Sequence, residues 1–302
     1  MDVPRSGSSS SAGTLPHWQA IALLSIIAAL VSQWIYAGSI PGDLSKTSIK
    51  NVLVLTAHPD DEVMFFAPAI LSLVAAGAQV YGLCMSAGNA DGLGDVRKSE
   101  LVQAYQSLGV PSTQVTLIDD PLLADGMDVA WNPAYIATKT AAVVYDHQID
   151  TILTFDSSGV SSHPNHVALH RAAWGYLGRS LGRERQNRIA EGKMDASASA
   201  GPLAPSVYAL HTPPLLSKFL SLPMALYSHA HAQRHLSIAP PTAPSRPGWP
   251  DRMHFLSSPG QYLRTLQAMQ AHASQLVWFR YLYVVFSRLM YGSQLDRIEV
   301  ML

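Results

Sequence analysis

The sequence contains a single cysteine and few charged residues. Cys84 is the only cysteine among 302 residues, so the chain can form no intrachain disulfide and no cysteine-rich zinc module. Charged residues make up 14%, well below the roughly 25% of an average globular chain. Hydrophobic residues make up 48%. This balance excludes disorder throughout the chain and indicates that part of the surface meets lipid or a partner.

The charges that are present nearly cancel. The chain has 20 Lys and Arg residues and 21 Asp and Glu residues, which gives a formal net charge of -1. A protein that binds nucleic acid through bulk electrostatics carries a clear basic excess, so we expect no nucleic-acid partner. The 12 histidines are the feature of the composition that points to chemistry.

An uncharged apolar segment lies near the N-terminus. Residues 1–17 are rich in serine and predict a disordered tail, whereas residues 18–37 carry no charge. Twenty helical residues at about 1.5 Å each span roughly 30 Å, which is the thickness of a bilayer core. We therefore predict a transmembrane anchor, with a cleaved signal peptide or a buried apolar helix as alternatives. The lysines that follow favour a cytosolic location for the C-terminal side.

After a linker at 38–50, strand and helix patterns alternate in residues 51–302. Apolar, β-branched runs predict buried strands, and longer segments with helical spacing separate them. The strands are expected at 51–57, 79–85, 114–118 and 150–155, and the helices at 61–76, 96–108, 134–147 and 165–181. The alternation predicts an α/β domain with a Rossmann-like, mainly parallel sheet and helices on both faces. Such sheets place their sites beyond the carboxyl ends of the strands.

Two segments interrupt this alternation. Residues 182–205 are polar and then rich in Ala and Ser, and residues 230–252 are rich in Pro, so both are interpreted as flexible insertions. Short strands are expected between them at 207–210 and 224–227, and a helix or a pair of helices at 261–291. Within that last segment, residues 276–291 are strongly apolar and could form either a core helix or a helix lying on a membrane.

Chemically active side chains follow the first predicted strand directly. The motif HPDDE contains His58, Asp60, Asp61 and Glu62 at the start of a predicted helix. Acidic residues and proline are common at helix starts, which accounts for Asp61 and Glu62. It does not account for the histidine or for the second acid, so we interpret the motif as functional.

A second cluster follows the fourth predicted strand. His163 and His166 are three residues apart where a helix begins, so they can share one face. The two strand ends could bring His58, Asp61 and His166 to one point, where two imidazoles and a carboxylate leave Zn²⁺ an open position. The spacing alone also allows His166 and His170 to form a helical ligand pair.

Two further side chains in these motifs suit the chemistry of hydrolysis. Asp60 could act as general base beside the metal. His163 could stabilise an oxyanion or protonate a leaving amine. The pattern therefore predicts a metal-dependent hydrolase.

These motifs resemble the LmbE-type metal-dependent de-N-acetylases and, within them, the N-acetylglucosaminylphosphatidylinositol de-N-acetylase (PIG-L) branch. The resemblance covers roughly residues 50–180, 205–228 and 260–298 and departs from the family pattern at Ala90 and Pro164. It rests on AHPDDE at 57–62, AGNADGLG at 87–94, RKxEL at 97–101, FDxxGVSxHxNH at 155–166 and HxSQxxWFR at 272–280.

The resemblance implies roles for the residues of these motifs. It implies that His58, Asp61 and His166 hold zinc or another divalent metal, that Asp60 is the general base and that His163 assists at the tetrahedral intermediate. In the glycine-rich loop, it implies that Asp91, Arg97 and Asn89 contact the substrate and that Glu100 holds Arg97.

The resemblance also implies an activity and a location. The activity is removal of acetate from N-acetylglucosaminylphosphatidylinositol, an early step of GPI-anchor synthesis. The protein would be a single-pass protein of the endoplasmic reticulum membrane, with a cytosolic catalytic domain and a membrane lipid as its substrate. The alternatives are a deacetylase of a soluble N-acyl sugar and a membrane-anchored binding protein without catalysis. The apolar segments 18–37 and 276–291 favour the lipid substrate, and the complete set of ligands and base favours an enzyme.

Overall fold

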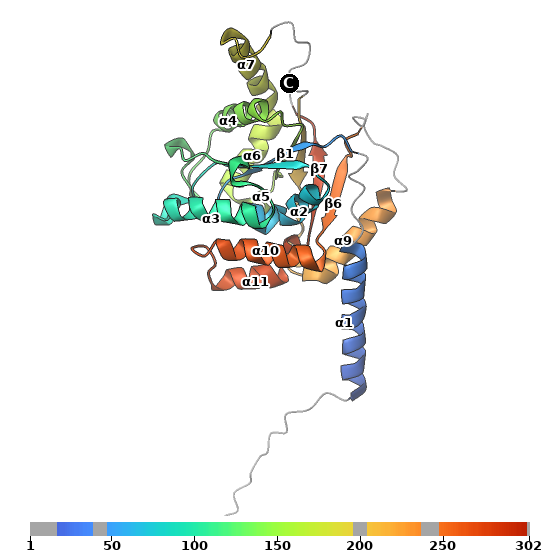
Figure 1. The fold of residues 1–302 in the computed structure, drawn as a ribbon. Coiled ribbons are helices and arrows are strands. Elements are labelled where there is room, and N and C mark those ends of the chain that lie inside the picture. The colour runs from blue at the N-terminus through green and yellow to red at the C-terminus, as the bar shows by residue number, and fades with distance from the viewer. Residues whose placement is uncertain (1–16, 39–46, 196–203, 237–247, 301–302) are drawn as a thin grey trace, which may run out of the picture.

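A seven-stranded sheet forms the centre of the computed structural model, which describes residues 17–38, 47–195, 204–236 and 248–300. The strand order is β3-β2-β1-β4-β5-β7-β6, and the neighbours from β3 to β5 are parallel (Figure 1). β7 pairs antiparallel with both β5 and β6. The strands are β1 (Asn51–Thr56), β2 (Gln79–Cys84), β3 (Val115–Leu117), β4 (Thr151–Phe155), β5 (Ser206–Leu210), β6 (Arg252–Leu256) and β7 (Gly292–Ile298). The predicted α/β fold with a mainly parallel sheet is confirmed.

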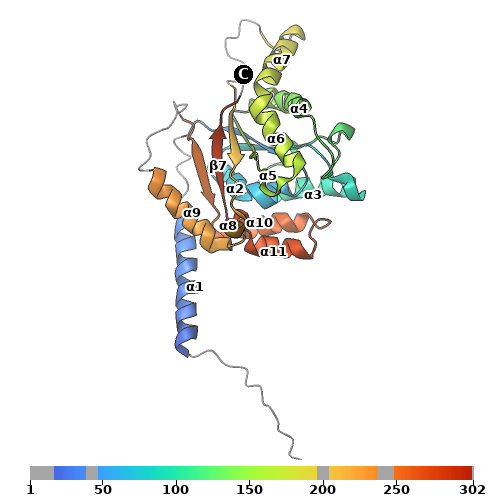
Figure 2. The same cartoon turned by 180° about the vertical axis from the view of Figure 1, so that it is seen from behind.

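Helices cover both faces of the sheet, as expected for parallel strands joined by crossovers. One group packs together on one face, and the other group packs on the opposite face (Figures 1 and 2). The first group is α2 (Ala67–Ala75), α3 (Gly94–Ser107) and α10 (Pro259–Ala271), and the second is α4 (Pro133–Asp146), α6 (Pro164–Gly175) and α7 (Leu177–Ala190).

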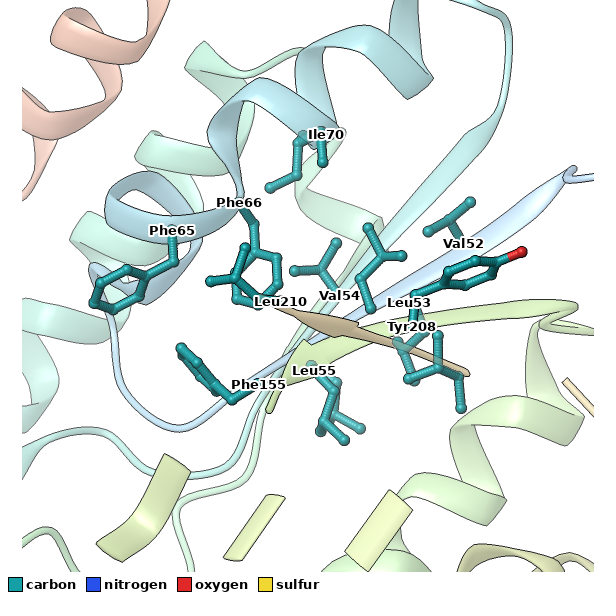
Figure 3. Packing of buried hydrophobic residues seen from close by; sticks show 14 of the residues in the cluster. Val52, Leu53, Val54, Leu55, Phe65, Phe66, Ile70, Phe155, Tyr208 and Leu210 are labelled. Atoms are coloured by element: carbon teal, nitrogen blue, oxygen red, sulfur yellow. The ribbon is translucent and has the colours of Figure 1, made fainter. Parts of the chain in front are cut away.

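The core begins at β1, whose apolar run 52–55 is buried on both faces. Figure 3 shows these side chains with aromatic rings from neighbouring elements. The rings of Phe65 and Phe66, on the turn after β1, lie 5.5 and 5.3 Å from the ring of Phe155 at the end of β4. Each fully buried side chain of this size contributes about 1.5–3 kcal/mol. This packing fixes the turn after β1 next to the end of β4.

Several predicted boundaries differ from the structure. Residues 224–227 belong to a helix, α9 (Ser221–Leu236), so the predicted strand there is wrong. A short apolar run does not distinguish strand from helix, and Pro223 is tolerated because it lies in the first helical turn. The predicted helix at 165–181 is divided at Tyr176 into α6 and α7.

Helices also extend into both predicted insertions. Residues 182–190 complete α7 and residues 230–236 complete α9, whereas 196–203 and 237–247 lie outside the described residues. Further along, the expected helix pair at 261–291 is present as α10 and α11 (Trp278–Phe286). The antiparallel strands β6 and β7 flank this pair and were not predicted.

Helix α1 (His17–Gly38) corresponds to the apolar segment predicted at 18–37. Its C-terminal part is attached to the domain, where Trp34 Nε1 donates to the Ser257 carbonyl at 2.6 Å and the indole packs against Tyr262 and Tyr291. Among the described residues, no helix is both long enough and apolar enough to cross a membrane, so the predicted span is not confirmed. Residues 1–16 and 39–46, which include most of the predicted tail and linker, are outside the described part of the chain.

A buried ion pair ties the C-terminal helices to the turn after β1. His272 Nε2 lies 2.5 Å from Glu62 Oε1, and both side chains are fully buried. Burial alone would lower the pKa of His272, but the Glu62 carboxylate raises it above its ordinary value. In the same loop, Gln275 Nε2 donates to the Pro59 carbonyl at 2.6 Å. The segment between α10 and α11 therefore supports the HPDDE turn.

We expect His272→Ala to lower the free energy of unfolding by about 3–5 kcal/mol, because Glu62 would keep a buried carboxylate without its partner. Urea denaturation followed by circular dichroism measures the change. The double variant Glu62→Gln/His272→Ala removes the charge as well and is expected to regain part of the lost stability. A single variant as stable as the wild type would contradict a structural role for this pair.

Candidate metal and catalytic site

The two predicted motifs meet at the carboxyl ends of β1 and β4. These strands are neighbours, with β2 and β3 on one side of them and β5 on the other. The order of strands reverses between β1 and β4, and a crevice forms at such a point. The motifs are in direct contact: His166 Nε2 lies 3.2 Å from Asp61 Oδ1, and Asn165 Nδ2 lies 3.1 Å from His58 Nε2. The topology therefore brings together residues that are more than one hundred positions apart.

Asp61 is held in place through one oxygen, and its other oxygen points into the site. Oδ2 accepts hydrogen bonds from the backbone N–H groups of Ala57 at 3.0 Å and His58 at 2.9 Å. Burial alone would raise the pKa of Asp61, but the neighbouring imidazoles of His166 and His58 hold it below its usual range. Asp61 is therefore an ionised carboxylate whose Oδ1 can bind a cation.

His166 presents its Nε2 to Asp61. Its Nδ1 lies 3.1 Å from the Gly159 carbonyl, which can only accept, so the ring proton is on Nδ1. Its Nε2 is buried and has no hydrogen-bond partner. The ring stacks on Phe155 at 4.0 Å, with an angle of 4° between the planes. A buried imidazole nitrogen in a ring whose orientation is fixed by its other nitrogen is typical of a metal ligand.

His58 is oriented in a similar way by a carboxylate. Its Nε2 lies 3.0 Å from Asp125 Oδ1, and its Nδ1 faces Asp61 Oδ2 at 4.0 Å. An imidazole that donates one N–H to a carboxylate leaves its other nitrogen free for a metal. The ligand atoms of His58, Asp61 and His166 lie within 4.8 Å of one another. These three residues fit a divalent ion with an open coordination position.

Asp125 was not identified from the sequence. It lies in the loop that follows β3, and therefore at the same sheet edge as the other two motifs. The rule that sites gather at the carboxyl ends of parallel strands could have indicated it. Asp125 and His163 also form a second group with His58 that could hold an ion. Because Asp125 contacts the outer nitrogen of His58, we interpret it as the residue that orients this ligand.

We expect Asp125→Asn to weaken zinc affinity by about 10- to 100-fold, because the ligand His58 would lose its carboxylate partner. Competition with a chromophoric chelator measures the affinity. Asp120→Asn is the matched control, since Asp120 lies in the same loop but bonds Tyr135 and Lys139 instead. Equal affinities in the two variants would show that Asp125 does not support the site.

Asp60, the predicted general base, is a buried residue in an unusual backbone conformation. Its backbone φ is 98°, a conformation that costs a non-glycine residue about 1–3 kcal/mol and that persists mainly at functional sites. The side chain is buried, and Oδ2 lies 2.7 Å from the guanidinium of Arg280 on α11. Burial raises the pKa of Asp60 to about 6, although Arg280 opposes the rise. A carboxylate with a pKa near neutrality can both accept and return a proton.

His163 caps α6 and directs its outer nitrogen away from the helix. Its Nδ1 accepts from the backbone N–H of Asn165 at 3.3 Å, so the proton of the neutral ring is on Nε2. Burial and the nearby His58 and His166 lower its pKa to about 4. The ring lies 5.0 Å from His58 and 4.9 Å from His166. This arrangement favours donation of a hydrogen bond to an oxyanion over transfer of a proton.

The glycine-rich loop that follows β2 is held by its own side chains. Arg97 bonds Asp91 at 2.8 Å and also donates to the Gly88 carbonyl. Asn89 Oδ1 accepts from the Gly94 N–H at 2.8 Å. These contacts place Arg97 and Asp91 together, but their role toward a substrate stays a prediction.

Glu100 does not hold Arg97 as expected. Its carboxylate instead accepts from the backbone N–H and the hydroxyl of Ser274, in the loop between α10 and α11. The contact between Arg280 and Asp60 was also not expected from the sequence. Arg280 belongs to the motif at 272–280, but no local pattern connects it with a residue 220 positions away. Together, these contacts show that the C-terminal motif is part of the site's support.

Comparisons with known proteins identify the family of this chain. The family model described as PIG-L: GlcNAc-PI de-N-acetylase matches residues 53–177. The N-acetylglucosaminyl-phosphatidylinositol de-N-acetylase of Bos taurus is 37% identical over 257 residues, which cover 85% of this chain and 85% of that protein. A probable enzyme of the same name from Schizosaccharomyces pombe is 33% identical over 254 residues, covering 83% of this chain and 88% of that protein.

A solved structure shows the same fold. The N,N'-diacetylchitobiose deacetylase from Pyrococcus horikoshii aligns with a TM-score of 0.53 at 15% identity, over 95% of this chain and 94% of that chain. At this identity the likeness concerns the fold alone. The sequence identities along most of both chains, however, show that this chain belongs to the PIG-L family of N-acetylglucosaminyl-phosphatidylinositol de-N-acetylases.

Proposed function

We propose that this chain is a deacetylase that hydrolyses the acetamide of N-acetylglucosaminylphosphatidylinositol, releasing acetate and glucosaminylphosphatidylinositol in GPI-anchor biosynthesis. One observation carries the proposal: the buried set His58, Asp61 and His166 stands beside the carboxylate of Asp60 in a chain that matches relatives of this name along most of its length. The three residues would supply the metal ligands and Asp60 the base that amide hydrolysis needs.

The metal is proposed to be Zn²⁺ or another divalent ion, held by His58, Asp61 and His166. The buried His166 Nε2 and Asp61 Oδ1, which face each other at 3.2 Å, support this assignment. When bound, such an ion polarises the acetamide carbonyl and lowers the pKa of a water molecule. Nitrogen and carboxylate ligands with one open position are typical of hydrolytic zinc sites.

The protein's own side chains then have distinct roles. Asp60 takes the proton from the attacking water and returns it to the leaving amine, with Arg280 keeping the carboxylate in position. The Nε2–H of His163 donates to the carbonyl oxygen as negative charge develops on it. Burial of Asp60 and Asp61 limits access of bulk water and so strengthens these interactions.

The glycine-rich loop is proposed to contact the sugar or its phosphate through Arg97, Asp91 and Asn89. Arg97 suits an anionic group because a guanidinium binds phosphate through two parallel hydrogen bonds. The reaction is proposed to take place at the cytosolic surface of the endoplasmic reticulum membrane. The single-pass topology implied by the motifs stays a prediction.

Release of labelled acetate from N-acetylglucosaminylphosphatidylinositol by the purified full chain tests this function. A soluble N-acetylglucosamine glycoside is assayed in parallel, and both assays are repeated with a chelator. Chelator-sensitive activity on the lipid alone is the expected result. Activity on the soluble sugar alone would assign a different deacetylase function. Zinc-loaded, folded protein inactive on both substrates would favour a binding protein.

A further inference from the structure

Two helices expose a joined apolar surface, here called the α8–α11 face. The ring centroids of Phe219, next to α8, and of Tyr283, on α11, lie 6.4 Å apart, so these two rings connect the two helices. Some of these side chains are extensively exposed, with Leu216 at 78% and Trp278 at 75%. The face consists of Leu215, Leu216, Phe219 and Leu220 at α8 (Leu215–Lys218) and of Trp278, Phe279, Tyr281, Leu282, Val285 and Phe286 on α11.

This surface lies at the end of the molecule from which α1 projects. Figures 1 and 2, which view the domain from opposite sides, both place α11 at that end, and Figure 2 places α8 beside it. The α1 helix also exposes apolar side chains, including Ile21, Leu24 and Ile26. A soluble domain seldom exposes so many large apolar side chains together without a partner. Tryptophan and tyrosine among aliphatic residues are typical of surfaces at a membrane interface.

The segment of sequence that carries the face contains almost no acidic residue. Between residues 206 and 295, Asp251 is the only acidic residue in the sequence. The same segment contains the basic residues Lys218, Arg234, Arg246, Arg252, Arg264, Arg280 and Arg288. Lys218 and Arg288 are buried and Arg280 pairs with Asp60, so these charges do not face outward. The near absence of acidic residues leaves no negative charge in this segment to repel a lipid surface.

The inner side of α11 contacts the catalytic site. Arg280 pairs with Asp60 at 2.7 Å, and the Tyr283 hydroxyl donates to the Met64 carbonyl at 3.1 Å. One helix of nine residues therefore has the exposed apolar surface on one side and the general base on the other. At about 1.5 Å per residue the helix is roughly 13 Å long. Its exposed apolar side chains and its contacts with the site are therefore separated by little more than the helix itself.

We propose that the α8–α11 face rests on the surface of a phospholipid bilayer and holds the site next to the headgroup of a lipid substrate. The inference deepens the proposed function and rests on it, because a lipid with its acyl chains in the bilayer presents only its headgroup to the enzyme. Contact through this face is separate from any contribution of α1.

A fluorescent label at Leu282→Cys tests the contact in the full chain. The native Cys84 is fully buried, so the introduced thiol is the one that reacts. Trp174→Cys is the matched control, because Trp174 is 45% exposed and Leu282 is 50% exposed, but Trp174 lies on α6. With vesicles of phosphatidylcholine and phosphatidylinositol that contain nitroxide lipid, we expect quenching at 282 and none at 174.

A second variant links the contact to turnover. Leu282→Asp is expected to lower activity on the lipid in vesicles by at least about tenfold while leaving activity on the acyl-free headgroup unchanged. The proposal would be overturned if the wild type hydrolysed the lipid, the label at 282 were not quenched, and Leu282→Asp kept its activity on the lipid in vesicles. A label at 282 that becomes shielded by self-association without lipid would assign the face to a second copy. Inactivity of the wild type on both substrates would instead contradict the proposed function.

Discussion

Asp60→Asn is expected to lower kcat by about 100- to 10,000-fold, because an amide cannot accept the proton of the attacking water. Asparagine has nearly the same size and shape, so the metal ligands beside it keep their geometry. The structure supports this variant in particular, since Asp60 is buried and lies next to the ligand Asp61 in sequence. Acetate release at saturating substrate gives kcat directly.

Metal content and thermal unfolding are measured on the same Asp60→Asn preparation, so that a folding or loading defect is not mistaken for a catalytic one. Asp146→Asn is a suitable control because Asp146 is exposed at the C-terminal end of α4, near the start of β4 and so at the opposite edge of the sheet. It is expected to retain wild-type activity. Near-normal turnover by folded, metal-loaded Asp60→Asn would eliminate Asp60 as the base.

His166→Ala is expected to weaken zinc affinity by more than about 100-fold, beyond the range seen when an outer partner is removed. The reason is that the substitution deletes the buried Nε2, the proposed ligand atom, which lies 3.2 Å from Asp61 Oδ1. Deacetylase activity should fall to background at equimolar zinc. Bound metal is measured by elemental analysis and affinity by chelator competition.

The matched control for this variant is His170→Ala on the same helix. His170 is half-buried, and its Nδ1 lies 3.3 Å from the Phe155 carbonyl. The structure places it outside the group formed by His58, Asp61 and His166, so its loss should leave zinc binding within a few-fold of wild type. If His170→Ala lost zinc and His166→Ala retained it, the ligand assignment would be wrong.

The meeting of the two motifs could be expected from the sequence because it depends on a simple rule. His58 and Asp61 follow one strand and His166 follows another, and parallel strands place such loops at one edge of the sheet. The same rule applies to Asp125 after β3, but the loop there has no motif that marks it. The strand predicted at 224–227 was wrong because its four apolar residues suit either kind of element, and packing of α9 selected the helix.

The sequence by itself determined the alternation of strands and helices and the chemical types at the strand ends, because these depend on preferences of neighbouring residues. Only the tertiary structure decided which distant residues support the site. His272 meets Glu62 across 210 positions, and Arg280 meets Asp60 in the same way. Such partners are chosen by how α10 and α11 pack on the sheet edge, and the energy of burying them is realised only after the chain has folded. The exposed side of α11 follows from the same packing, since the helix has an inner contact with the site and no described neighbour over its outer apolar side chains.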